Sequence, residues 1–281
     1  MLTVQSALAD ASERLQASAS AQLDAELLLA QVLDKNRSWL FAWPEHTLTQ
    51  EQQQAFTTLC ERRERGEPVA YLLGRRGFWT FEVEVGPAVL IPRPETELLV
   101  EQALRLGTDL VGKVADLGTG SGAIAIALAS ERADWQVHAT ELSAEAQSVA
   151  AANFRKTGHS NLHLLAGSWC RPLPGRDYVL IVSNPPYIDA SDPHLQEGDV
   201  RFEPRQALVA DEAGLADLRN IACQTQDYLV AGGWLLLEHG WQQGSAVRGL
   251  LAGLGYTDIS THRDYSNHER VTVGRTGAGN T

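Results

Sequence analysis

The sequence predicts an α/β protein: a mostly parallel sheet with helices on both faces, preceded by a small helical domain. From about residue 113 onward, apolar strand-like runs alternate with helical patterns, which is typical of consecutive β-α-β units. Residues 1–75 instead show helical periodicity, and residues 76–91 are rich in aromatic and β-branched side chains. We therefore expect a helical domain over 1–75, a β-hairpin linker over 76–91 and the α/β domain over 92–281.

The helical domain is predicted from spacing and capping residues. In "AQLDAELLLAQVLD", Leu23, Leu27 and Ala30 recur at helical spacing. Thr49 and Gln52 fit a capping box at the start of "TQEQQQAFTTLCERRERG". This part holds 7 Lys+Arg and 10 Asp+Glu, so its charge is 7 − 10 = −3. It is not a basic module for reading DNA.

The linker and the strands follow in order. The stretch "RGFWTFEVEVGPAVLI" predicts β structure with a turn at Gly86-Pro87, and Pro94 suits the first turn of the next helix. Strand-like runs in the α/β domain are "KVADLG", "QVHATE", "LHLLAGS", "DYVLIVSN" and "GGWLLLEHG". The last two, "TDISTHRD" and "RVTVGR", are expected to form an edge pair.

Composition limits the classes of function. The 281 residues are 44% hydrophobic and 21% charged, which is an ordinary composition for a globular protein. The net charge of −12 counts against a protein that binds nucleic acid. No apolar run approaches the ~18 residues of a membrane span, and the first residues do not resemble a signal peptide. We therefore expect a cytoplasmic protein that binds neither a membrane nor DNA directly. We also expect it to be a monomer.

Cysteine and histidine spacing predicts no metal site. Cys60, Cys170 and Cys223 lie far apart without a CxxC pair, so we expect reduced thiols. His159 and His163 are four residues apart, but no third ligand is evident, and we interpret them as surface residues.

A glycine-rich loop follows the first strand of the α/β domain. "VADLGTGSGAIAIAL" places Gly118, Gly120 and Gly122 between a strand and a helix, where glycine permits a tight turn and close approach of a ligand. Glu141 ends the next strand, where an acid can accept hydrogen bonds from two ribose hydroxyls. Trp169 either stacks on a flat base or is an ordinary core tryptophan. Together the loop and the acid indicate a site for an adenosine-type ligand.

A rigid elbow, "SNPPYI", follows the fourth strand of this domain. Asn184 offers a side-chain carbonyl, and Pro186 restricts Pro185 to extended conformations, which can aim the Pro185 carbonyl outward. Two aimed carbonyl oxygens can hold both hydrogens of a planar NH2 group, and the Tyr187 ring can lie against it. This arrangement suits methylation of an sp2 nitrogen, and a sulfonium donor brings its own leaving group.

Taken with "LIPRPETE", "GDVRFEPRQALVA", "LLLEHGWQQG" and "DYSNHERVTVGR", these motifs resemble the HemK/PrmC family over nearly the whole chain. That family belongs to the Rossmann-like class I methyltransferases, with a mostly parallel seven-stranded sheet. It uses S-adenosyl-L-methionine to methylate the glutamine of the Gly-Gly-Gln motif in peptide-chain release factors, leaving S-adenosyl-L-homocysteine. The resemblance implies a cofactor site of Gly118, Thr119, Gly120, Ser121, Gly122, Glu141, Trp169 and Asn184. It also implies that the glutamine amide is held by Asn184, Pro185, Pro186 and Tyr187, of which Asn184, Pro185 and Tyr187 are catalytic.

The chain departs from the family pattern at two positions. Ser168 stands where an acid is common, which puts a contact from that acid to the adenine amino group in doubt, and Glu141 stands where aspartate is common. The residues of "IPRPETE" and "DVRFEP" either contact the release factor, brace the elbow or form structural ion pairs, and Glu238 and His239 are equally ambiguous. The residues concerned in these two motifs are Arg93, Glu95, Glu97, Arg201 and Glu203.

Three other functions stay open from the residues alone. The elbow also occurs in enzymes that methylate a glutamine of a ribosomal protein and in DNA adenine methyltransferases, although the acidic balance argues against DNA. A nucleotide-binding regulatory protein with a dead site is the third, and the intact elbow beside an intact glycine loop argues against it. We expect the helical domain to bind the partner, because a glutamine on an exposed loop offers little binding surface.

Overall fold

A computed structural model describes residues 2–277 of the 281. Its contacts divide the chain into two units, one reaching to Arg75 and including Gln196–Phe202, the other comprising Arg76–Leu195 and Glu203–Thr281. The sequence did not suggest that Gln196–Phe202 groups with the helices. No helix within the described part is long and apolar enough to cross a membrane.

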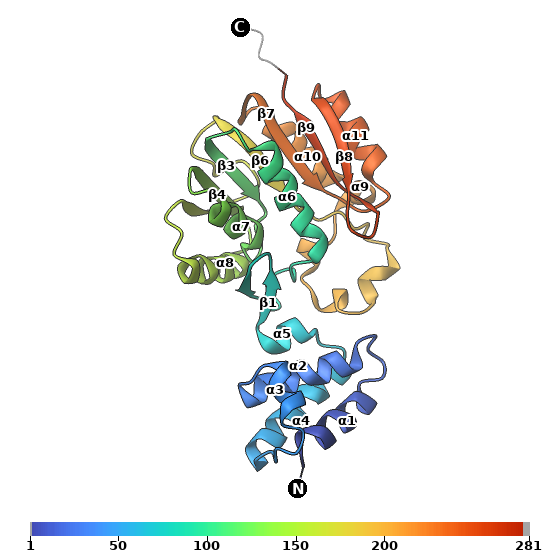
Figure 1. Ribbon diagram of the computed structural model, residues 1–281. Coiled ribbons are helices and arrows are strands. Elements are labelled where there is room, and N and C mark those ends of the chain that lie inside the picture. Colours follow the sequence, from blue (N-terminus) through green and yellow to red (C-terminus); the bar gives the residue numbers. More distant parts are fainter. Residues whose placement is uncertain (1, 278–281) are drawn as a thin grey trace. The chain divides into compact units, whose positions relative to one another are not determined.

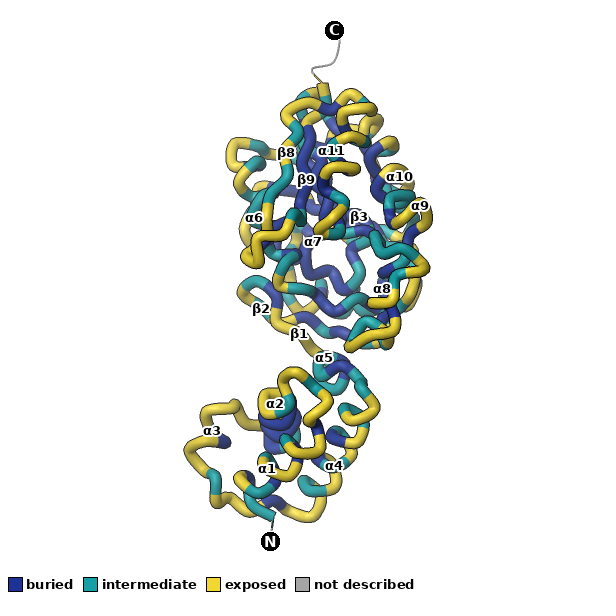
Figure 2. The backbone as a smooth tube through the Cα atoms, turned by 90° about the vertical axis from the view of Figure 1, so that its right-hand side faces the viewer, coloured by how far each residue is buried: buried dark blue, intermediate teal, exposed yellow. Residues whose placement is uncertain are grey.

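The first unit is a bundle of short helices whose core is built around α2. Its central helix carries the buried Leu28 and Leu29 and contacts each of the other helices of the bundle (Figure 2). The Thr49 side chain accepts from the Gln52 backbone N–H, and the Gln52 side chain accepts from that of Thr49, which is the predicted capping box. The helices are α1 (Val4–Arg14), α2 (Ala21–Leu33), α3 (Arg37–Ala42), α4 (Gln50–Glu64) and α5 (Val69–Leu73).

The Gln196–Phe202 segment is tied to these helices by two arginines and an acid. Arg63 Nη1 lies 3.0 Å from Asp199 Oδ1, and Arg63 Nε lies 2.8 Å from Asp24 Oδ2. Arg201 Nη2 donates to the Arg65 carbonyl at 3.2 Å. Arg201 is therefore a structural partner of α4 rather than of the sheet.

The second unit opens with a two-stranded hairpin and contains one seven-stranded sheet (Figure 1). The strand order is β5-β4-β3-β6-β7-β9-β8, with β9 antiparallel to both β7 and β8 and the other neighbours parallel. This confirms the predicted fold class, including the edge pair. The strands are β1 (Arg75–Phe78), β2 (Phe81–Glu84), β3 (Gly112–Leu117), β4 (Trp135–Glu141), β5 (Leu162–Ala166), β6 (Tyr178–Ser183), β7 (Leu229–Glu238), β8 (Thr257–Arg263) and β9 (Glu269–Arg275).

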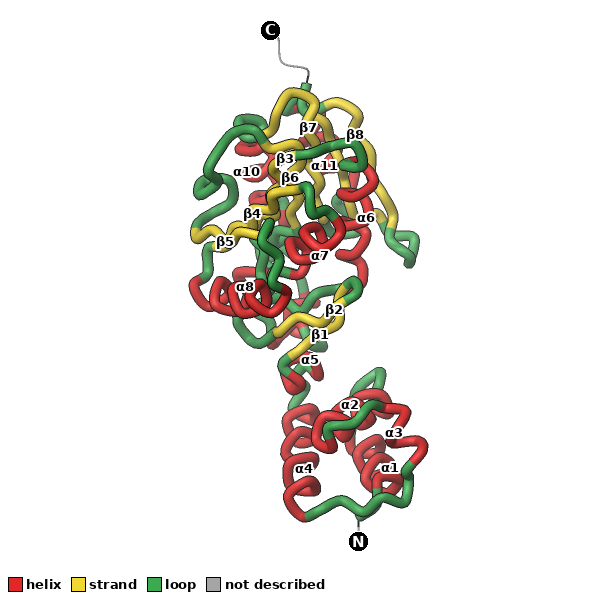
Figure 3. Tube along the Cα trace, turned by 60° about the vertical axis from the view of Figure 1, so that its left-hand side comes forward, coloured by secondary structure: helices red, strands yellow, loops and turns green. Residues whose placement is uncertain are grey.

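Helices cover both faces of this sheet, with α6 and α7 on one face and α10 and α11 on the other (Figures 1 and 3). Because both faces are covered, the central strands are nearly continuous apolar runs, and Leu117, Ile181 and Leu237 are fully buried. The helices are η1 (Pro94–Thr96), α6 (Glu97–Leu106), α7 (Ala123–Glu131), α8 (Ala144–Thr157), η2 (Pro193–Gln196), η3 (Val200–Phe202), η4 (Arg205–Ala207), α9 (Asp211–Gly214), α10 (Ala216–Thr225) and α11 (Gly244–Gly253).

The parallel register brings the carboxyl ends of the central strands together. Leu117 of β3 pairs with Thr140 of β4 on one side and with Ser183 of β6 on the other. The loops that follow these strands therefore leave the sheet side by side, at the edge where ligands bind in open α/β sheets.

Candidate active site

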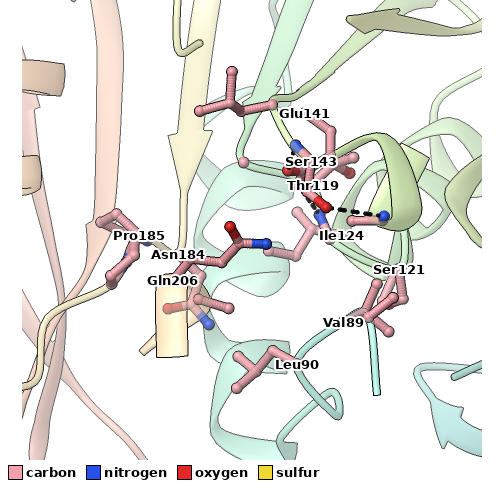
Figure 4. Close-up of a pocket in the computed structure, with 18 of the residues that line it drawn as sticks. Val89, Leu90, Thr119, Ser121, Ile124, Glu141, Ser143, Asn184, Pro185 and Gln206 are labelled. Atoms are coloured by element: carbon pink, nitrogen blue, oxygen red, sulfur yellow. Dashed lines mark hydrogen bonds between the residues drawn. The ribbon is translucent and has the colours of Figure 1, made fainter. Parts of the chain in front are cut away.

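A cavity of about 430 Å3 lies at this edge of the second unit (Figure 4). Its size falls within the ordinary range for small-molecule sites. Of the residues predicted for the site, the cavity is lined by Gly118, Thr119, Gly120, Ser121, Glu141, Trp169, Asn184, Pro185 and Pro186. Gly122 and Tyr187 are not part of this lining.

The glycine loop owes its shape to three left-handed backbone conformations. The φ angles of Gly118, Gly120 and Gly122 are 72°, 57° and 86°, a region that other residues rarely adopt. A Cβ at Gly122 would lie 2.4 Å from the Phe154 ring, whereas one at Gly120 would meet nothing within 4 Å. Gly122 is thus required by the packing of α8 against the loop, and Gly120 leaves open space beside its backbone.

Glu141 is held at the wall of the cavity by backbone donors. Its Oε2 accepts from Gly120 N–H at 3.0 Å, and its Oε1 accepts from Ser143 N–H at 2.9 Å. These bonds fix the carboxylate while leaving acceptor capacity on both oxygens. The loop backbone and the acid therefore form one rigid corner, suited to a ligand that donates hydroxyl hydrogens.

A second acid, Asp116, is buried beneath the glycine loop. Its Oδ2 accepts from the Thr119 hydroxyl at 2.5 Å, and its Oδ1 has no hydrogen-bond partner among the described residues. Burial raises the pKa of Asp116 to about 7, although the bond from Thr119 opposes the rise. No sequence motif predicted a role for Asp116.

Trp169 belongs both to the cavity wall and to the core. It lines the cavity together with Ser168, packs against the core cluster that includes Leu218, and has a φ of 48°. A Cβ at Gly118 would lie 2.9 Å from its ring, so the glycine gives the indole its place. Trp169 thus lies both at the cavity and against the core, which fits either predicted role. Its stacking on a base stays a prediction.

The elbow after β6 is anchored at its start. The Ser183 hydroxyl donates to the Leu117 carbonyl at 2.7 Å, which joins the elbow to the strand that carries the glycine loop. Asn184 Nδ2 donates to Thr96 Oγ1 at 3.3 Å. One of its two amide hydrogens is thereby bonded within the protein, and the side-chain carbonyl can still accept from a ligand.

Tyr187 contacts the core and lies outside the cavity lining. Its ring packs against the core, and its hydroxyl donates to Glu238 Oε1 at 3.5 Å. Burial raises the pKa of this phenol above its usual value, so Tyr187 is neutral. The predicted contact between its ring and a flat substrate group stays untested.

Two of the sequence motifs meet through an ion pair whose acid is buried. Arg93 of "IPRPETE" lies 2.5 Å from Glu203 of "DVRFEP", and Glu203 also accepts from the Ile91 N–H at 3.0 Å. Glu97 accepts from the Trp79 N–H at 2.9 Å. These contacts favour a bracing role for Arg93, Glu97 and Glu203 over direct contact with a partner.

The remaining candidate ligands do not form a site. His163 stacks at 5.3 Å on His138, and within residues 2–277 no group of three or more His, Cys, Asp or Glu side chains could hold a metal ion. Cys60 and Cys170 are buried and Cys223 is exposed, all three as free thiols. The buried His239 bonds to the Gly240 carbonyl and to Thr272, so its role is structural.

Several lining residues were not singled out from the sequence. They are Thr96, Leu142, Gln206 and Asp217, contributed by η1, the loop after β4, η4 and α10. Gln206 lies within the motif "GDVRFEPRQALVA", but no pattern in the sequence directs this motif, the loop after β4 or α10 to the cavity.

Comparison with known proteins agrees with this geometry. Residues 6–74 match the PrmC N-terminal domain, and residues 94–199 match the methyltransferase small domain. The release factor glutamine methyltransferase of Escherichia coli (strain K12) is 51% identical over 268 residues, which cover 95% of this chain and 97% of the relative. That of Vibrio cholerae is 50% identical over 277 residues, covering 98% and 97%.

Solved structures show a similarity of fold only. A methyltransferase from Pyrococcus furiosus superimposes with a TM-score of 0.52 at 18% identity, covering 72% of this chain and 91% of that one. The catalytic domain of hMettl16, in complex with an RNA hairpin, gives 0.55 at 16% identity, covering 82% of each chain. With half of all positions shared with the curated relatives over nearly their full length, the resemblance is confirmed, and the chain belongs to the HemK/PrmC family of release factor glutamine methyltransferases.

Proposed function

We propose that this protein methylates the side-chain amide nitrogen of the glutamine in the Gly-Gly-Gln motif of peptide-chain release factors. The observation that carries the proposal is the identity of about half of all positions with release factor glutamine methyltransferases, over 95% or more of the chain. The product is N5-methylglutamine, and the reaction serves translation termination.

The cofactor is S-adenosyl-L-methionine, whose sulfonium group supplies an activated methyl group and its own leaving group. The cavity fits it in three respects. The open space at Gly120 admits the methionine part close to the loop backbone, and Glu141 is fixed where it can accept from ribose hydroxyls. Leu142 and Trp169 supply apolar walls for the adenine ring. Ser168 lies in the same wall and offers a hydroxyl where relatives carry an acid.

The elbow then orients the nucleophile. An amide nitrogen is a poor nucleophile because its lone pair is delocalised into the carbonyl. The Asn184 side-chain carbonyl and the Pro185 backbone carbonyl accept from the two N–H groups, which favours positive charge developing on nitrogen and aligns its lone pair with the methyl carbon. When bound, the sulfonium would supply the methyl group, its carbon–sulfur bond breaking as the new C–N bond forms, and the amide nitrogen would then lose one proton to water.

The helical unit supplies the partner specificity in this proposal. We assign residues 1–75 as the domain that binds the release factor, 76–91 as the hairpin linker and 92–281 as the catalytic domain. A single glutamine on a loop contributes little binding energy, so contacts elsewhere on the factor have to supply the rest. The enzyme acts as a monomer in the cytoplasm, where release factors work.

A transfer assay tests the proposal. The protein is incubated with methyl-labelled S-adenosyl-L-methionine and, separately, release factor, ribosomal proteins or DNA. Label should enter release factor alone and should be lost when its Gly-Gly-Gln glutamine is replaced by alanine. Labelling of ribosomal protein or DNA instead, or labelling of the alanine variant, would overturn it.

A further inference from the structure

Four side chains form a connected chain behind the elbow. Asn184 Nδ2 donates to Thr96 Oγ1 at 3.3 Å, and the Tyr187 hydroxyl donates to Glu238 Oε1 at 3.5 Å. The Thr96 hydroxyl also lowers the pKa of the Glu238 carboxyl, and we infer from this that Thr96 links the two pairs. Thr96 lines the cavity, so the inferred chain runs from the Asn184 amide to a buried acid that does not itself line the cavity.

Glu238 is an unusual residue to find there. It ends β7, is 1% exposed, and its Oε2 has no hydrogen-bond partner among the described residues. An acid that only braced the elbow would be expected to have both oxygens paired. Its charged neighbours are Glu95 on η1, which disfavours ionisation, and Arg270 on β9, which favours it.

The chemistry of the elbow makes the orientation of the Asn184 amide decisive. The substrate NH2 has two donors, so Asn184 has to present its carbonyl and not its own NH2. A threonine hydroxyl can accept from the Asn184 NH2 while donating its own hydrogen elsewhere. An ionised carboxylate only accepts, so an ionised Glu238 holds the Thr96 hydrogen and leaves the Thr96 oxygen to Asn184.

We propose that Thr96 and Glu238 are positioning residues that fix which end of the Asn184 amide faces the substrate, with the charge of Glu238 setting the direction of every hydrogen bond in the chain. The inference rests on the proposed function, since it concerns the same amide. When Glu238 is protonated, its O–H can donate to Thr96, and Thr96 can then donate to the Asn184 carbonyl. That reversal turns the Asn184 NH2 toward the substrate NH2, and donor then faces donor.

A pH dependence follows from the burial of Glu238. Burial raises its pKa to about 7, against opposing contributions from Thr96, Arg270 and Tyr187. The productive, ionised form therefore gains population as pH rises through about 7. Measured with saturating release factor and cofactor, kcat should increase across that range and level off above it.

Threonine variants test the chain without removing the acid. Thr96→Val keeps the shape and loses the hydroxyl, and we expect kcat to fall roughly 10- to 100-fold, the usual scale for a lost positioning contact in a site. Thr96→Ser should keep kcat near wild type. Thr225→Val is the control for the cost of burying valine. Thr225 lies on α10, and its buried hydroxyl is bonded to the Tyr256 hydroxyl, so this variant should leave kcat unchanged. Equal kcat in wild type and Thr96→Val would overturn the proposal.

Glu238→Gln tests the role of the charge. We expect the acid limb of the kcat profile to vanish in this variant, while the dissociation constant of S-adenosyl-L-methionine stays within about threefold of wild type, since Glu238 is not part of the cavity wall. In 15N-labelled protein, the Asn184 side-chain NH2 signals, assigned from their absence in Asn184→Ala, should shift with pH around 7 in wild type and stay constant in Glu238→Gln. An unchanged acid limb in Glu238→Gln would refute the role of its charge.

The same assay separates the two proposals. If wild type fails to methylate release factor, the proposed function falls. If wild type methylates it and Thr96→Val does so equally well, the proposed function stands and the positioning role falls. The NH2 signals need no turnover, so they test the hydrogen-bond chain even in a variant without activity.

Discussion

The glycine loop and the proline elbow lie side by side, and their backbone conformations are fixed in opposite ways. They follow the paired strands β3 and β6, whose last residues are Leu117 and Ser183. The loop depends on glycines in conformations that other residues rarely adopt, whereas the elbow depends on prolines that exclude most conformations. In the function we propose, the loop brings its backbone close to the cofactor, and the elbow holds two carbonyls toward the substrate amide.

Each loop also has a buried acid behind it. Asp116 lies beneath the glycine loop and Glu238 behind the elbow, and each has one oxygen without a hydrogen-bond partner among the described residues. Burial raises the pKa of both to about 7. The difference lies in their connections: Asp116 bonds to Thr119 within its own loop, whereas Glu238 is the acid that we propose acts on Asn184 through Thr96. Substitutions in the elbow should therefore lower kcat, whereas substitutions in the glycine loop should lower stability or cofactor affinity.

Asn184→Ala should give the largest effect, confined to transfer. Removing the aimed carbonyl takes away one of the two acceptors for the substrate NH2, so we expect kcat to fall by at least about 100-fold. Binding of S-adenosyl-L-methionine, measured by calorimetry, should weaken far less. Asn220→Ala, an exposed asparagine on α10, is the matched control and should behave as wild type. Activity near wild type in Asn184→Ala would remove this residue from the mechanism.

Two alanine substitutions in the glycine loop should separate folding from cofactor binding. At Gly122 the new Cβ would meet the Phe154 ring at 2.4 Å with φ at 86°, so we expect the free energy of unfolding to drop by roughly 2 to 3 kcal/mol. At Gly120 no atom lies within 4 Å, so only the backbone cost of about 1 kcal/mol applies to folding. Cofactor affinity should fall in Gly120→Ala, because its Cβ takes the space beside the loop backbone.

Urea denaturation without cofactor, followed by calorimetry with it, measures both effects. The loop comparison would be wrong if the two variants lost the same stability, or if Gly120→Ala bound S-adenosyl-L-methionine as tightly as wild type.

Local sequence rules account for the frame of this site. The glycines, the prolines and the ends of strands are visible in the chain because φ restrictions and hydrophobic runs are properties of short segments. They predicted the sheet, the cavity edge and nine of the residues that line the cavity. The Tyr187 hydroxyl reaches Glu238 and its ring packs against the core, and the predicted contact of this ring with the substrate stays a prediction.

What the sequence did not predict depends on long-range packing. Thr96 and Asn184 are 88 positions apart and meet only because α6 and β6 contact each other in the folded unit. Asp217 enters the cavity from the first turn of α10, which no periodicity directs there. The burial of Asp116 likewise depends on how the glycine loop folds back over it, so its raised pKa follows from the tertiary structure.

The smallest predicted effect concerns stability and the acid beneath the glycine loop. A carboxyl whose folded pKa is raised stabilises the fold fully below its unfolded pKa, and that contribution is lost as pH rises through the folded value. For Asp116 at about 7, the free energy of unfolding should fall by about 1 kcal/mol between pH 6 and pH 8. Asp116→Asn keeps an acceptor for Thr119 and removes the charge, so its stability relative to wild type should rise over this range.

Urea denaturation of both proteins at pH 6 and pH 8, without cofactor, gives this difference directly. Because Asp116 bonds within its own loop, its replacement should leave the acid limb of the kcat profile in place, whereas Glu238→Gln should remove it. If Asp116→Asn abolished that limb as well, the pH dependence could not be assigned to the elbow. The contrast between an acid that only supports its loop and one that orients a catalytic amide would then fail.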